Sequence, residues 1–219
     1  MPAKNNSLPS LHRPLDCLRL CLIADRQQAR GGLVETVEAA LGAGVRAVQL
    51  RERESSTREL FELATRLREA TRRHGALLLV NDRADVALAV GADGVHLGWQ
   101  SMPAAVVRRL VGPGRLVGRS VHNFEEAQRA AAEGVDYIFA GPVYDTPSKA
   151  GLVTALGPEG LRAIRRAAAV PVIGLGGIDA TNAGAVMEAG AEGVAVIRAI
   201  LAATDPAMAA RDLLVMVGK

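Results

Sequence analysis

The side chain best suited to acid–base chemistry is His122, which lies in the segment GRSVHN at residues 118–123. Histidine titrates near neutral pH and can both accept and donate a proton in one reaction cycle. The segment follows an apolar run of strand length and precedes a helical pattern that Asn123 could cap. We therefore take His122 as the candidate catalytic residue, the alternative being a loop histidine bonded to backbone. His96, inside the strand-like GVHLG, is expected to be structural.

Three basic side chains are placed to bind an anion. Arg51 and Arg53 lie two residues apart after an apolar run, so an extended backbone would present both on one face. Lys149 lies in TPSKAG, a segment rich in turn-forming residues, and a point charge on such a loop suits anion capture. The alternatives are a surface ion pair of the arginines with Glu52 or Glu54, and a solvated lysine.

A phosphate site is predicted in the last third of the chain. The segment GLGGID at 174–179 follows an apolar run, and Gly176 and Gly177 would let backbone N–H groups approach an anion. Ile197 and Arg198 follow the next apolar run and open a short helix, whose N-terminus adds a positive dipole. The alternative is a plain tight turn.

Asp82 is the one candidate for binding a metal ion. Mg²⁺ bound together with a diphosphate uses one or two carboxylates, and the second is wanted after the next strand. The chain there reads WQSM at 99–102 and offers no acid. We therefore expect no metal and no cofactor, with Mg²⁺ on Asp82 as the alternative.

Eight apolar runs of strand length alternate with helix-period segments along the chain. Such a pattern is typical of parallel strands buried on both faces, and eight units of about 27 residues would use all 219 residues. The sequence therefore predicts an α/β fold, a (β/α)₈ TIM barrel in one catalytic domain at 15–219 behind a flexible tail at 1–14. The strand candidates are 18–24, 45–50, 76–80, 93–97, 115–118, 136–140, 170–174 and 193–197.

A weak internal repeat supports this register. GAGVRAVQL at 42–50 recurs as GADGVHL at 91–97, EGVDYIFAG at 133–141 and GAEGVAVI at 190–197. In each copy a glycine stands where a helix should end and a strand follows directly. The repeat therefore marks every second strand.

In this fold the active site lies at the C-terminal ends of the strands. Polar side chains that follow strand candidates are thus the predicted substrate ligands. They are Gln49, Arg51, Arg53, Asn81, Ser120 and Lys149.

Composition excludes several classes of partner. The net charge is +3 and aromatic residues make up 3%, too few for the stacking platforms of nucleic-acid-binding proteins. No apolar stretch is long enough to span a membrane, and the first 14 residues lack the apolar core of a signal peptide. We expect a cytoplasmic protein whose partner is a small anionic phosphate compound. The sequence leaves the oligomeric state open, and a homo-oligomer is possible.

Seven segments together resemble the thiamine-phosphate synthase and thiazole tautomerase superfamily, a family of (β/α)₈ barrels. The resemblance covers about residues 18 to 202. The segments are LIADR (22–26), VQLRER (48–53), LLVNDRADVALAVGADGVHLG (78–98), VGRSVHNFEEA (117–127), DYIFAGPVYDTPSK (136–149), PVIGLGGI (171–178) and GVAVIRAI (193–200).

The synthase branch joins a pyrimidine diphosphate to a thiazole phosphate and releases diphosphate, with Mg²⁺ held by two aspartates. The resemblance places one aspartate at Asp82 and the other where this chain has Ser101, and Trp99 replaces a usual glutamine. It also implies the following diphosphate contacts, all of which are present: Arg51, Arg53, Asn81, Ser120 and Lys149.

The tautomerase branch aromatises a carboxythiazole phosphate without a metal, and the resemblance to it is closer in GRSVH and in TPSKAG with Leu156-Gly157. It implies that His122 moves the proton between ring carbon and exocyclic carbon. We therefore expect a thiazole tautomerase, an isomerase of vitamin B1 biosynthesis. The ranked alternatives are the Mg²⁺-dependent synthase and a non-catalytic barrel that binds thiazole or thiamine phosphate.

Overall fold

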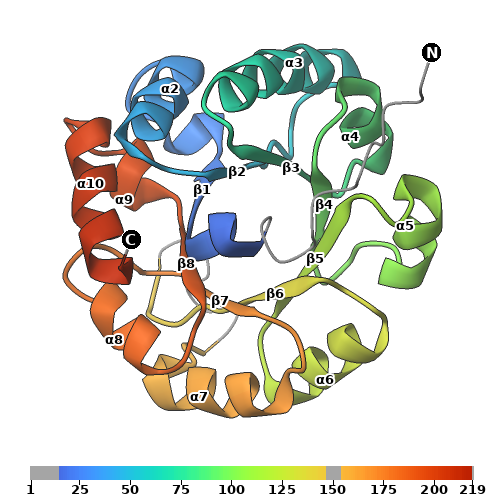
Figure 1. Ribbon diagram of the computed structural model, residues 1–219, viewed down its shortest axis with the longest axis vertical. Helices are drawn as coiled ribbons and strands as arrows, with labels where there is room; N and C mark the ends of the chain where they lie inside the picture. Colours follow the sequence, from blue (N-terminus) through green and yellow to red (C-terminus); the bar gives the residue numbers. More distant parts are fainter. Residues whose placement is uncertain (1–14, 147–153, 219) are drawn as a thin grey trace, which may run out of the picture.

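The chain folds into a closed barrel of eight parallel strands in the order β1 to β8, which confirms the predicted TIM barrel. The computed structural model describes residues 15–146 and 154–218. Figure 1 looks along the barrel and shows the ring of strands at the centre with the helices around it. The tail at 1–14 and Lys149 lie outside the described residues, so predictions about them stay predictions.

The elements alternate along the chain as the hydrophobic pattern indicates. The strands are β1 Leu20–Ala24, β2 Ala47–Leu50, β3 Leu77–Asn81, β4 Gly94–Leu97, β5 Leu116–Val121, β6 Tyr137–Ala140, β7 Val172–Leu175 and β8 Gly193–Val196. The helices around them are α2 Leu33–Ala43, α3 Thr57–Arg73, α4 Ala84–Val90, α5 Ala104–Val111, α6 Phe124–Ala132, α7 Gly157–Ala167, α8 Ala183–Glu188, α9 Arg198–Leu201 and α10 Pro206–Val217. Two short 3₁₀ helices, η1 Cys17–Arg19 and η2 Arg26–Gln28, flank β1.

Every strand except β4 contributes apolar side chains to two separate cores, because successive side chains point to opposite faces. In β1, Leu20 and Leu22 pack under the helices, whereas Cys21 and Ile23 fill the inside of the ring. The inner core also holds Leu18 of η1, which lies across the end of the barrel where the strands begin (Figure 1). The rigid ring fixes the position of every strand end, and these ends carry the predicted site.

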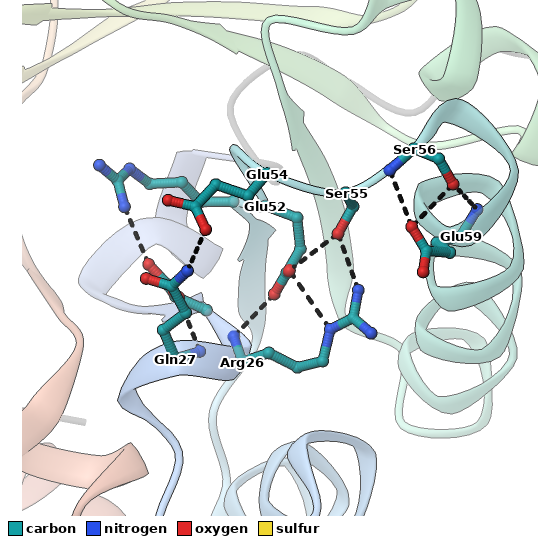
Figure 2. Close-up of polar contacts among 9 residues, drawn as sticks. Arg26, Gln27, Glu52, Glu54, Ser55, Ser56 and Glu59 are labelled. Atoms are coloured by element: carbon teal, nitrogen blue, oxygen red, sulfur yellow. Dashed lines mark hydrogen bonds and ion pairs between the residues drawn. The ribbon is translucent and has the colours of Figure 1, made fainter.

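Local capping fixes where the helices start. Ser56 and Glu59 form a capping box at α3, in which the Glu59 carboxylate accepts from the Ser56 N–H at 2.8 Å (Figure 2). The Asn123 side chain accepts from the Glu126 N–H at 2.8 Å, so the predicted cap of α6 is confirmed.

Several element boundaries differ by a few residues from those expected, and the end of β5 bears most directly on the predicted site. Strand β5 was expected to end at residue 118 but runs to Val121, because Ser120 and Val121 continue the pairing with Phe139 and Ala140 of β6. Ser120 therefore lies in the strand itself and not in the loop. Helix α8 begins only at Ala183, because the Asp179 carboxylate accepts from the backbone N–H and hydroxyl of Thr181 and forms a turn instead.

No helix in the two described segments is long and apolar enough to cross a membrane.

Candidate active site at the C-terminal end of the barrel

Arg51 is anchored where β1 and β2 end. Its backbone N–H donates to the Ala24 carbonyl at 2.9 Å, and its Nη1 donates to Asp25 Oδ2 at 2.9 Å. Burial lowers the pKa of Arg51, the neighbouring Arg53 lowers it further, and Asp25 opposes both effects. Within residues 15–146 and 154–218 the guanidinium contacts one carboxylate oxygen, which leaves further N–H donors for an anion.

The loops after β1 and β2 are tied together around Arg51 by a second set of contacts (Figure 2). Glu52 accepts from the Arg26 backbone N–H at 2.7 Å and from its Nε at 3.3 Å, while Arg26 Nη2 donates to Ser55 at 2.8 Å. Glu54 accepts from Gln27 Nε2 at 2.8 Å. Glu52 and Glu54 thus contact the loop after β1, and Glu52 also accepts from the Ser55 hydroxyl at 3.1 Å. The carboxylate that contacts Arg51 is Asp25.

A chain of amide and carboxylate groups crosses from β2 to the loop after β3. Gln49 is buried, and its Nε2 donates to Asn81 Oδ1 at 3.0 Å. Asn81 Nδ2 in turn donates to Asp82 Oδ2 at 2.8 Å. Among the described residues the Gln49 Oε1 atom has no hydrogen-bond partner. A buried oxygen without a hydrogen-bond partner can accept a hydrogen bond from a bound ligand.

Asp82 is exposed at the mouth of the barrel in a left-handed backbone conformation, with φ of 60°. Its backbone N–H donates to the His96 carbonyl at 3.0 Å. Its Oδ1 atom accepts from the Gly98 N–H at 3.2 Å and from the Ser101 hydroxyl. Ser101, which stands where a second acid would be needed to bind a metal ion, therefore donates a hydrogen bond to Asp82.

Ser120 is linked to the inside of the barrel. Its hydroxyl lies 2.9 Å from His96 Nε2, and His96 Nδ1 lies 3.2 Å from the Tyr137 hydroxyl. Burial lowers the pKa of His96 to about 3 and raises that of Tyr137 well above its usual value, so both groups are neutral at physiological pH. Both ring nitrogens of His96 have partners, as expected for a structural histidine.

His122 lies directly after β5, where it contacts the first turn of α6. Its Nδ1 lies 3.0 Å from Glu126 Oε2, and its backbone N–H donates to the same oxygen at 2.8 Å. A carboxylate in this position orients the imidazole ring. The side chain is 14% exposed, so it is close to solvent.

The glycine-rich turn after β7 packs against the loop after β6. Gly176 and Gly177 have φ of 98° and 65°, and a Cβ on either would come within 2.7 Å of Pro142 or Tyr144. Only glycine fits this turn, which lies beside the segment that leads to Lys149. Helix α9 begins at Arg198 after β8, as the sequence predicted. Phosphate binding by Gly176, Gly177, Ile197 and Arg198 stays a prediction.

The structure brings most of the predicted ligands to one end of the barrel, because they follow or end parallel strands. Contacts link Gln49 to Asn81, and Arg51 to the end of β1. Sequence reasoning missed Tyr137 as the partner of His96, because the two residues are 41 positions apart and both have the pattern of core residues. It also left open which acid pairs with Arg51. The segment LIADR was a usable signal, since Asp25 directly follows a strand.

Comparisons with known proteins identify the family and agree with the fold. The family described as thiamine monophosphate synthase matches residues 20–200. A putative thiamine-phosphate synthase of Geobacter sulfurreducens is 52% identical over 198 residues, covering 90% of this chain and 93% of that protein. A thiamine-phosphate synthase of Chloroflexus aurantiacus is 47% identical, covering 91% and 92%. The solved thiamine phosphate pyrophosphorylase of Pyrococcus furiosus superposes with a TM-score of 0.85 at 40% identity, covering 92% and 96%.

Proposed function

Because the chain belongs to the thiamine monophosphate synthase family, we propose that it is a thiamine-phosphate synthase of vitamin B1 biosynthesis. It would join hydroxymethylpyrimidine diphosphate to thiazole phosphate and release diphosphate. The names of its relatives favour this transferase over the tautomerase that the sequence analysis ranked first. The observation that carries the proposal is a set of possible hydrogen-bond donors to an anion, Arg51, Asn81 and Ser120, at the mouth of the barrel. The similarity of the chain to thiamine-phosphate synthases supports it.

In the proposed reaction the thiazole nitrogen forms a bond to the methylene carbon of the pyrimidine as the carbon–oxygen bond to diphosphate breaks. Negative charge therefore grows on the leaving diphosphate, and groups that stabilise this charge speed the reaction. Arg51 and Arg53 supply positive charge, and Asn81 and Ser120 supply neutral donors. The unpartnered Gln49 Oε1 would accept a hydrogen bond from the bound substrate. Lys149 is a proposed further contact.

The donor set at Asp82 fits a weakly held Mg²⁺ ion. A carboxylate offers about four acceptor positions, and Asp82 uses three of them for Asn81, Gly98 and Ser101. Among the described residues no group of three potential metal ligands occurs. Mg²⁺ would therefore be held by Asp82 and mainly by the substrate phosphates. When bound, the ion would neutralise charge on the leaving diphosphate.

The second substrate carries a phosphate group, for which we propose the turn at Gly176 and Gly177 and the start of α9 at Ile197 and Arg198. The tight packing of this turn on Pro142 and Tyr144 holds its backbone in a fixed shape. A preorganised backbone binds an anion without the cost of ordering a loop.

The tautomerase remains a second candidate because of one observation, the contact of His122 with Glu126. This pair could act as a base and acid on a carboxythiazole phosphate. The synthase mechanism above uses neither residue.

The test is an assay of the purified protein with both synthase substrates and Mg²⁺. We expect thiamine phosphate and diphosphate in equal amounts. Absence of both products would exclude the synthase. Isomerisation of the carboxythiazole phosphate in EDTA would then identify a tautomerase, whereas saturable binding of thiazole phosphate without any product would identify a binding protein.

A further inference from the structure

The inside of the barrel contains a continuous hydrogen-bonded path from its core to its mouth. His96, Gly118 and Tyr137 lie side by side on β4, β5 and β6, since His96 pairs with Gly118 and Gly118 pairs with Tyr137 in the strand register. A Cβ at Gly118 would lie 2.1 Å from Tyr137 Cζ. The missing side chain therefore lets the tyrosine ring pass over β5 and reach His96.

Ser120 continues this path toward the mouth. It lies two residues beyond Gly118 on β5 and therefore points to the same face of the strand. Its hydroxyl lies 2.9 Å from His96 Nε2, while the Tyr137 hydroxyl lies 3.2 Å from Nδ1 on the other side of the ring. Phe139 packs on the imidazole with ring centroids 4.2 Å apart, which fixes the plane of the ring.

We propose that Tyr137 and His96 are positioning residues that fix the Ser120 hydroxyl as a hydrogen-bond donor to an anionic oxygen of the substrate. A neutral imidazole has one N–H and one acceptor nitrogen. Among the described residues the Tyr137 hydroxyl contacts His96 Nδ1 at 3.2 Å. Because a buried phenol proton needs an acceptor, we assign the phenol as the donor and Nδ1 as the acceptor. Nε2 then carries the proton and donates to Ser120, whose own proton is left for the mouth of the barrel.

The opposite proton order would give a different site. If Nδ1 carried the proton, Nε2 would accept the Ser120 proton and the serine would present only lone pairs to the mouth. Lone pairs repel a phosphate oxygen, and the buried Tyr137 proton would be left without an acceptor, which is unfavourable inside a protein. The arrangement with a donating phenol satisfies every group and favours an anion. This inference rests on the proposed diphosphate contact of Ser120.

The first measurement is the tautomer of His96, obtained from the ¹⁵N shifts of protein labelled on histidine and assigned by loss of the signal in His96→Gln. We expect the Nε2–H form in the wild type and a mixture of both forms in Tyr137→Phe. Phe139→Leu changes packing on the same ring without removing a hydrogen bond, so it should keep the Nε2–H form. A dominant Nδ1–H form in the wild type would overturn the proposal.

The second measurement is the affinity for inorganic diphosphate at fixed Mg²⁺, by calorimetry. We expect Ser120→Ala to weaken binding about tenfold or more, since a hydrogen bond to a charged group is lost. Tyr137→Phe should weaken diphosphate binding roughly three- to tenfold when introduced into the wild type. When introduced into the Ser120→Ala variant it should weaken binding less than about 1.5-fold, because Tyr137 acts through the Ser120 hydroxyl. Equal effects in both backgrounds would contradict the proposal. Neither measurement needs turnover, so failure of the synthase assay is separately visible.

Discussion

The two ends of the barrel use the same residue types, arginine and acid, in opposite ways. Where the strands begin, Asp93 accepts from the Leu78 backbone N–H at 2.8 Å, its own N–H donates to the Leu78 carbonyl at 2.9 Å, and Arg68 donates to both carboxylate oxygens. We call such a group of acid, arginine and backbone a clasp. Two further clasps are Asp136 with Arg108 and Val117, and Glu192 with Arg165 and Val172.

The clasp acids fall on the internal repeat of the sequence, one residue before β4, β6 and β8. The fourth copy has Arg46 at this position, and its Nη1 donates to the backbone carbonyls of Leu41 and Val45 instead. The carboxylates are thus satisfied from several sides at this end, whereas at the mouth Arg51 has one carboxylate partner and Gln49 Oε1 has none among the described residues. The first clasp also has one buried atom without a partner among the described residues, Arg68 Nε. The contrast between the two ends therefore lies in the acids: the clasp carboxylates are fully used by the fold, whereas the unpartnered Gln49 acceptor at the mouth can bind a ligand.

The largest expected effect is at the mouth, in Arg51→Gln. Loss of this positive charge should lower kcat/KM for thiamine phosphate formation about 10²–10³-fold, the range for removing one group that stabilises developing charge. The Tm should change by less than about 3 °C, because Arg51 has a single intramolecular carboxylate partner. Steady-state kinetics and thermal unfolding measure both. Arg162→Gln, in an exposed pair with Glu159 on α7, is the control and should change neither.

The opposite response is expected at the clasps. Asp93→Ala leaves Arg68 and the Leu78 N–H without this partner, and should lower the free energy of unfolding by about 2–4 kcal/mol. The Tm would fall by roughly 5–10 °C, while KM for both substrates stays within about twofold. Glu159→Ala, which removes an 87% exposed carboxylate, should lower the Tm by no more than about 2 °C. If Asp93→Ala raised KM without lowering Tm, the division between the two ends would be wrong.

The interior between the two ends should respond to pH. Burial lowers the pKa of His96 from 6.5 to about 3, so between these values the unfolded chain binds a proton that the folded chain does not. The contribution of neutral His96 to the free energy of unfolding is therefore fully present above about pH 6.5. It decreases as the pH falls, by up to about 1.4 kcal/mol per pH unit. Urea unfolding should show that the free energy of unfolding decreases between pH 7 and pH 5 by about 2 kcal/mol more in the wild type than in His96→Gln.

The control for this comparison is Phe139→Leu, which alters packing on the same ring and keeps the titrating group. It should retain the wild-type dependence on pH even if it is less stable throughout. An equal loss in His96→Gln and the wild type would show that His96 takes up its proton without unfolding.

The sequence predicted the barrel because each strand carries its own signal, a short apolar run, and a helix-ending glycine precedes every second strand. The same local signals predicted the Asn123 cap and the start of α9. They misplaced the end of β5, since Arg119 and Ser120 are polar, and pairing with the neighbouring strands β4 and β6 keeps them in the strand.

What the sequence could not give is the pairing between strands. The contacts of Arg51 with Asp25 and of His96 with Tyr137 depend on which residues the closed ring places side by side. The contact of His96 with Tyr137 also depends on the space left by the missing side chain of Gly118. No local sequence pattern shows that the Tyr137 ring occupies this space.

A smaller gain of function at the mouth is expected from Ser101→Asp. A second carboxylate beside Asp82 should lower the Mg²⁺ concentration for half-maximal activity about tenfold, because Mg²⁺ binding with diphosphate then uses two carboxylates. Ser101→Ala is the matched control: it removes the same hydrogen bond to Asp82 and adds no charge. Equal Mg²⁺ requirements in all three proteins would mean that the ion binds away from Asp82.

The smallest effect is expected for His122→Ala, and it divides the two candidate functions. In a synthase His122 stabilises no charge on the diphosphate, and its contact with Glu126 lies in the turn that starts α6. Thiamine phosphate formation should therefore change less than about threefold. A tautomerase would lose at least about 100-fold, in line with general acid–base catalysis. Glu126→Gln, which keeps a carbonyl oxygen at the His122 contact, should match wild-type synthase activity. A loss of synthase activity as large as that of Arg51→Gln would mean that the chemical site extends from the diphosphate side of the mouth to the loop after β5.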